Sequence, residues 1–89
     1  MVKISKKERA ELIRKGNRLF NDGKIEKASR IFETVQYIDG LIRVGDHYYA
    51  KKELVNSLIY YKKANYQKRI EQLAPEIASI CKAWIAEGE

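Results

Sequence analysis

The sequence of 89 residues predicts an all-α fold of five helices, four of them paired as two helical hairpins. The first observation is an internal repeat, because Leu-Ile-Arg-Lys-Gly at residues 12–16 returns 29 positions later as Leu-Ile-Arg-Val-Gly at 41–45. The second is the spacing of apolar residues, which recur every three or four positions between short runs of turn residues. The third is that strand-like alternation is missing from the whole sequence. Together they favour repeated α-hairpins.

The first repeat is expected over about residues 6–36. Ser5 is followed three residues later by Glu8, a capping-box signature, so the first helix should begin near Lys6 and end at about Asn21. Residues 21–23, Asn-Asp-Gly, then form a turn. The second helix ends near residue 35 and carries an inward stripe of Ile25, Ala28, Ile31, Phe32 and Val35.

The second repeat is expected over about residues 38–65, with its first helix at roughly Ile38 to Lys51. The next helix carries an apolar stripe of Leu54, Leu58, Tyr61 and Ala64 and ends near Asn65. A closing helix over about residues 67–87 completes a single domain formed by residues 1–89.

Pro75 leaves two arrangements open for the closing segment, because proline breaks a hydrogen bond inside a helix but suits the first position of one. In one, a kinked helix begins near Gln67 and continues through Pro75. In the other, the preceding helix extends to Leu73 and a shorter helix begins at Pro75. The register of the repeat favours the kinked helix.

Two glycines fall in the middle of predicted helices. Glycine there costs about 0.5–1 kcal/mol relative to alanine, so a packing reason is expected. We expect a neighbouring helix to cross at Gly16 and at Gly45. The facing small positions are Ala28, Val35, Ser57 and Ala64, and the space beside them is filled by Leu19 or Tyr48 together with Phe32 or Tyr61.

Composition narrows the classes of function. No apolar run approaches the roughly 20 residues of a membrane helix, and the charged N-terminus does not resemble a secretory signal, so we place the chain in the cytoplasm, away from membranes. Cys81 and His47 are single residues of their kinds, which argues against a disulfide, a metal site, a cofactor or a catalytic pair. An enzyme is therefore not expected. The net charge of +6 comes from residues 1–30, which hold ten basic and four acidic side chains.

The spacing of the repeated positions resembles the tetratricopeptide repeat (TPR) family. The first copy supplies Leu12, Gly16, Leu19, Gly23, Ala28, Phe32 and Val35. The second supplies Leu41, Gly45, Tyr48, Ser57, Tyr61 and Ala64, so the resemblance covers about residues 9–66. The chain departs from the family in its offset, which is shorter than the family's usual period of about 34 residues, in Lys15, which replaces an apolar residue, and in Lys52, which replaces the turn glycine.

The resemblance implies a right-handed array of α-hairpins that binds a peptide or helix of another protein along a concave groove, without catalysis. It assigns the groove to the first helix of each hairpin, at Ile13, Asn17, Phe20, Asn21, Ile42, Asp46, Tyr49 and Ala50, flanked by Arg14 and Arg43. The basic N-terminal segment makes an acidic partner a candidate. The opposing interpretation is that Phe20 and Tyr49 pack between neighbouring hairpins.

Two other functions remain open. Two hairpins leave apolar faces that further repeats usually cover, so the chain could self-associate or join a larger complex, with Tyr37, Tyr60, Tyr66 and Trp84 as candidates for that face. Nucleic-acid binding is the weaker alternative, because the basic residues are not interleaved with stacking aromatics.

Overall fold

The computed structural model describes the backbone of residues 4–88 and the side chains of residues 4–79. This part of the chain holds five helices and no strand, which confirms the predicted all-α class. The helices are α1 (Lys6–Asn21), α2 (Ile25–Thr34), α3 (Ile38–Ala50), α4 (Leu54–Lys63) and α5 (Gln67–Gly88). The first four helices end within two residues of the predicted positions, and α1 and α3 begin at the predicted residues.

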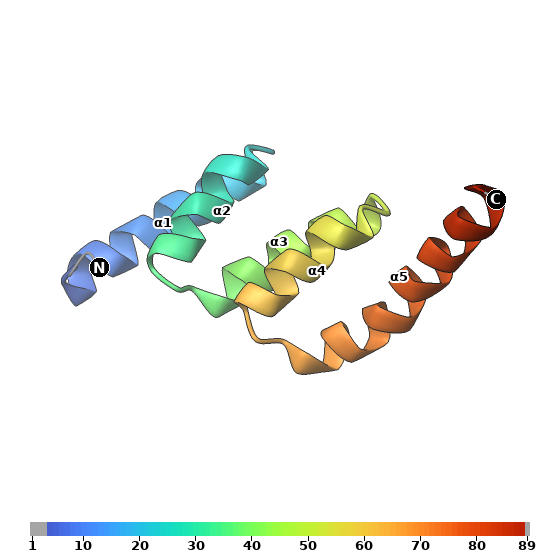
Figure 1. Ribbon diagram of the computed structural model, residues 1–89. Helices are drawn as coiled ribbons and strands as arrows, with labels where there is room; N and C mark the ends of the chain where they lie inside the picture. Colours follow the sequence, from blue (N-terminus) through green and yellow to red (C-terminus); the bar gives the residue numbers. More distant parts are fainter. Residues whose placement is uncertain (1–3, 89) are drawn as a thin grey trace.

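The helices pack in the order of the chain. α1 contacts α2 and α3 contacts α4, while α2 contacts α3 and α4 contacts α5. Figure 1 shows the α1–α2 and α3–α4 hairpins one after the other, with α5 following as a single helix. The result is an elongated molecule of 55 × 24 × 21 Å.

The predicted capping box begins α1. The Glu8 amide donates to the Ser5 hydroxyl over 3.1 Å, and the Ser5 amide donates to the Glu8 carboxylate over 3.2 Å. These bonds satisfy two backbone donors that the first turn of a helix leaves without partners.

Glycines give the buried aromatic rings their space, as expected. A Cβ atom on Gly16 or on Gly40 would lie 2.6 Å from the nearest ring atom of Phe32. A Cβ atom on Gly45 would lie 2.6 Å from the ring of Tyr61. Both rings are fully buried. The core is therefore built on aromatic side chains that lie directly against helix backbone.

The sequence repeat is also present in the backbone geometry. We call two residues repeat equivalents when they occupy the same position in successive copies, as Leu12 and Leu41 do. Positive φ angles occur at the equivalents Gly23 (83°) and Lys52 (62°), and again at the equivalents Gln36 (52°) and Asn65 (54°). Lys52 takes the left-handed conformation that Gly23 adopts without strain. Equivalent turns thus form even where glycine is missing.

α5 runs without interruption through Pro75. The alternative, with α4 extended to Leu73 and a new helix at Pro75, is wrong. α4 ends at Lys63, because the chain turns into the left-handed conformation at Asn65. Among the described residues, no helix is both long and apolar enough to cross a membrane. The side chains of Cys81 and Trp84 lie outside the described residues.

Candidate functional site

Two predicted groove residues of α1 meet an arginine from α3. The Arg43 guanidinium donates a hydrogen bond to the Asn17 side-chain oxygen. Its central carbon also lies 5.5 Å from the centre of the Phe20 ring, within the range of a cation–π contact. All three side chains are half-buried. Arg43, expected only to flank the groove, is therefore at the centre of this cluster.

A second cluster follows in the next copy of the repeat. Asp46 and Tyr49 of α3 are the repeat equivalents of Asn17 and Phe20, and they meet Arg69 of α5. The guanidinium carbon of Arg69 is 4.8 Å from the centre of the Tyr49 ring, and its Nη2 is 3.9 Å from the Asp46 carboxylate. We call Asn17, Phe20 and Arg43 the first arginine–aromatic unit, and Asp46, Tyr49 and Arg69 the second.

The second unit is tied to the core. The buried Tyr61 hydroxyl donates a hydrogen bond to the Asp46 carboxylate. Burial, and then this hydrogen bond, raise the pKa of Tyr61 above its usual 10.0. The Asp46 carboxylate thus contacts a neutral phenol from the core and a guanidinium from α5, which fixes its position on the surface.

The remaining predicted groove residues are arranged less tightly. Ile13 and Ile42 are half-buried, whereas Asn21 and Ala50 are exposed at the last residues of α1 and α3. Arg14 is exposed on α1. Next to the second unit is a surface hollow of about 280 Å³, lined by Ile42, Asp46, Tyr66, Lys68, Arg69 and Gln72.

Sequence reasoning missed Arg69. The repeat equivalent of Arg43 is Gln72, so the register of the repeat leads to Gln72 and not to Arg69. Arg69 lies about one helical turn before Gln72 on α5, and its side chain reaches Asp46 from there.

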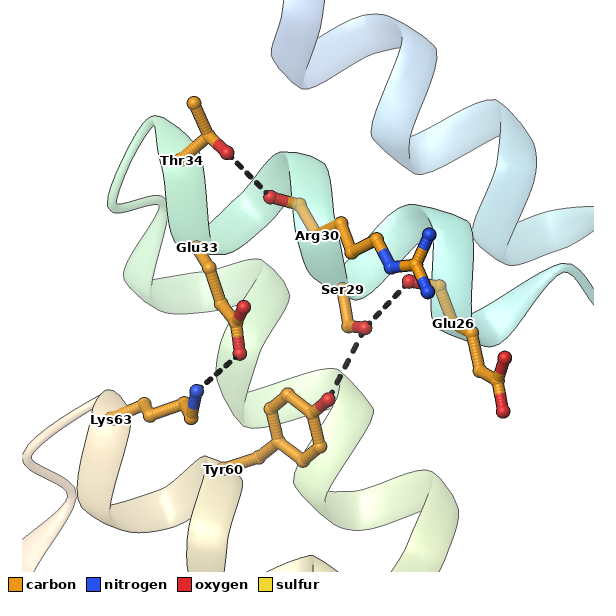
Figure 2. Close-up of polar contacts among 7 residues, drawn as sticks. All are labelled: Glu26, Ser29, Arg30, Glu33, Thr34, Tyr60 and Lys63. Carbon is orange, nitrogen blue, oxygen red and sulfur yellow. Dashed lines mark hydrogen bonds and ion pairs between the residues drawn. The ribbon is translucent and has the colours of Figure 1, made fainter. Parts of the chain in front are cut away.

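The second helices of the two hairpins meet through polar contacts. Figure 2 shows the Tyr60 hydroxyl directed at Ser29 Oγ, 3.3 Å away, and Lys63 Nζ at Glu33, 2.6 Å away. The hydrogen bond from Lys63 to Glu33 raises the pKa of Lys63. Ser29 in turn donates to the Glu26 carbonyl over 2.8 Å. These contacts connect α2 directly to α4, whereas the predicted groove lies along α1 and α3.

Of the tyrosines proposed for an assembly face, two lie largely within the fold. Tyr60 stacks on Tyr48 with ring centres 5.7 Å apart, and the Tyr37 ring lies 5.6 Å from that of Phe32. Tyr66 is 37% exposed and contacts Tyr61 edge-on.

Within residues 4–79, no group of histidine, cysteine and acidic side chains could hold a metal ion. No family model matches the chain, and no solved structure matches it. The sequence is 33% identical over 82 residues to an uncharacterized protein of Treponema pallidum (strain Nichols), an alignment that covers 92% of this chain and 79% of the relative.

Proposed function

We propose that this chain, which belongs to the same family as the uncharacterized Treponema pallidum protein, is a non-catalytic module that binds another protein. The bound element is a peptide or helix of the partner, held along the first helices of the hairpins in the manner of a TPR groove. The matching glycine, aromatic and small residues of the two hairpins support a TPR-like arrangement.

The observation that carries the proposal is the pair of arginine–aromatic units. Each combines a half-buried ring, a guanidinium and an Asn or Asp side chain, and the ring and the polar residue are repeat equivalents in the two units. Aromatic rings and arginine are the side chains most enriched at binding hot spots. Their internal contacts hold them in place, which lowers the entropy lost on binding.

The chemistry of the units favours an acidic partner segment with apolar residues. A guanidinium carries five N–H donors, and Arg43 directs one of them to Asn17, so further donors remain for a carboxylate. Phe20 and Tyr49 offer apolar area beside these donors. The excess of basic residues in residues 1–30 would steer an acidic segment toward the first unit.

The test compares three arginine variants in affinity capture from a bacterial lysate followed by mass spectrometry. Arg43→Gln and Arg69→Gln keep a polar side chain but remove the charge from each unit. Arg30→Gln makes the same change on the exposed surface of α2, a second helix, and is the matched control. Circular dichroism and thermal unfolding establish that all three variants fold.

We expect the wild type and Arg30→Gln to capture the same protein, and Arg43→Gln and Arg69→Gln to lose it. An NMR titration with the captured partner should then shift the amides of Asn17, Phe20 and Tyr49. The proposal is rejected if the arginine-unit variants capture the partner as well as the wild type does.

A further inference from the structure

α5 has the features of a first helix whose hairpin partner is missing from the described residues. Leu73 is the repeat equivalent of the buried Val44 and is itself buried, at 1% exposure. Ala74 is the equivalent of Gly45 and, one copy earlier, of Gly16, and both glycines are buried beneath aromatic rings of a second helix. Ala74 is exposed. Within the described side chains, the face of α5 that would form a hairpin is therefore exposed at Ala74 and half-buried at Ile77.

α4 has an unpaired side next to this face. In the first hairpin, Glu26, Ser29 and Glu33 lie on the side of α2 that faces α4, as the contacts to Tyr60 and Lys63 show. Their repeat equivalents on α4 are Val55, Leu58 and Lys62. Val55 is 63% exposed, and Leu58 beside it is half-buried. The side of α4 that continues the α2–α4 contact is thus apolar and partly uncovered.

α4 contacts α5, and by repeat equivalence these two faces correspond to the faces of α2 and α3 on which α4 packs. We call them the open edge and define it by Val55, Leu58 and Lys62 of α4 with Ala74 and Ile77 of α5. One copy earlier, the corresponding faces belong to α2 and α3, and α4 packs against both of them. By repeat equivalence, the open edge is therefore the next position in the series of second helices.

We propose that the open edge binds an amphipathic α-helix of another protein, in the position that α4 takes against α2 and α3. Two features of this helix follow from the chain itself. Its residue opposite Lys62 is acidic, and its residue opposite Ala74 is aliphatic rather than aromatic.

The acidic residue follows from the charge on α4. Glu33 of α2 pairs with Lys63 of the next second helix. The equivalent of Glu33 on α4 is Lys62, which reverses the sign. Lys62 is exposed, and no ion pair involves it among the described residues. If the bound helix carries a carboxylate at the position equivalent to Lys63, it can form an ion pair with Lys62 that corresponds to the Glu33–Lys63 pair.

The aliphatic residue follows from the space at Ala74. The rings of Phe32 and Tyr61 lie 2.6 Å from the point where a Cβ atom would stand on Gly16 or Gly45. Ala74 has that Cβ atom, so an aromatic ring in the same position would overlap it. This also disfavours a second copy of this chain as the occupant, because its own second helices carry Phe32 and Tyr61 at that position.

The test uses a fluorescein-labelled peptide of residues 53–65 that carries Tyr61→Leu and Lys63→Glu, titrated with the full chain and followed by fluorescence anisotropy. A second peptide carries Tyr61→Leu alone, and a third has the native sequence. We expect the first peptide to bind at least about tenfold more tightly than the native one, a difference of about 1.4 kcal/mol.

Variants of the chain then locate the peptide. Val55→Asp, at an exposed position in the first turn of α4, should weaken binding of the first peptide at least about tenfold without unfolding the chain. Lys62→Glu should weaken binding of the first peptide about threefold. On this variant the peptide with Tyr61→Leu alone, which keeps Lys63, should bind more tightly than the first peptide. Lys7→Glu, the same charge change on the exposed surface of α1, should leave all affinities unchanged.

Equal binding of the three peptides, or binding that Val55→Asp does not weaken, would overturn the proposal. So would a dimer in light scattering that Val55→Asp dissociates, because a second copy would then cover the open edge. Arg43→Gln should not affect the peptide, so this result and a failure of the proposed groove are distinguishable.

Discussion

Replacing Gly45 with alanine should destabilise the fold, although alanine is the better helix former. The new Cβ atom would lie 2.6 and 2.7 Å from two ring atoms of Tyr61, which is fully buried. Alanine gains about 0.5–1 kcal/mol in the middle of a helix, whereas overpacking a core costs about 1–3 kcal/mol. We expect a net loss of about 1 kcal/mol, measured by urea unfolding followed by circular dichroism, or about 4–8 °C in Tm.

Two contacts hold the Tyr61 ring in place against Gly45. The Tyr61 hydroxyl is bonded to Asp46, and the Arg69 guanidinium lies 5.9 Å from the ring centre. In a Tyr61→Leu background the overlap disappears, so Gly45→Ala should then stabilise by about 0.5–1 kcal/mol. The change of sign is the decisive result. If Gly45→Ala raises the stability of the wild-type chain, the ring is mobile and the packing argument fails.

Three further changes test the local interactions. Ser5→Ala removes the exposed cap of α1 and should lower the free energy of unfolding by about 1 kcal/mol in urea, and no change would show that the first turn adds nothing to stability. Lys52→Gly should raise the free energy of unfolding by about 0.5 kcal/mol. Removing the left-handed lysine gains about 1–2 kcal/mol, and the greater freedom of glycine in the unfolded chain offsets about 0.4–1 kcal/mol of that gain. Burial raises the pKa of Tyr61 above 10.0, so the stability that the neutral phenol contributes is present below pH 10 and is lost as the pH rises through the pKa of the folded state. Above pH 10, the Tm of Tyr61→Phe should therefore fall less steeply with pH than the Tm of the wild type.

Much of the fold could be predicted because the strongest constraints are local or repeated. The Ser5 cap is encoded within a single helical turn, and the apolar period marks each helix. The pairing of Gly45 with Tyr61 leaves a signal in the sequence, since a glycine in mid-helix needs a reason. The path of the chain at Pro75 was less certain, because proline is compatible with either arrangement until the end of α4 is known.

The candidate site was harder to predict from the sequence than the fold, because its polar contacts depend on how far side chains reach and not on the register of the repeat. Asn17, Phe20, Asp46 and Tyr49 follow the repeat, and the structure brings each pair together with an arginine. Arg69 does not follow it, since a long side chain can reach the same place from a different turn of its helix.

That difference makes the two arginine–aromatic units unequal in charge. In the first unit Arg43 pairs with the neutral Asn17, so the positive charge is not cancelled within the unit. In the second unit Arg69 lies beside the Asp46 carboxylate, which offsets its charge. The basic excess of residues 1–30 adds to the first unit and not to the second. An acidic segment on this face would therefore be attracted with its carboxylates toward α1, leaving its apolar residues for Tyr49 and the hollow beside α5.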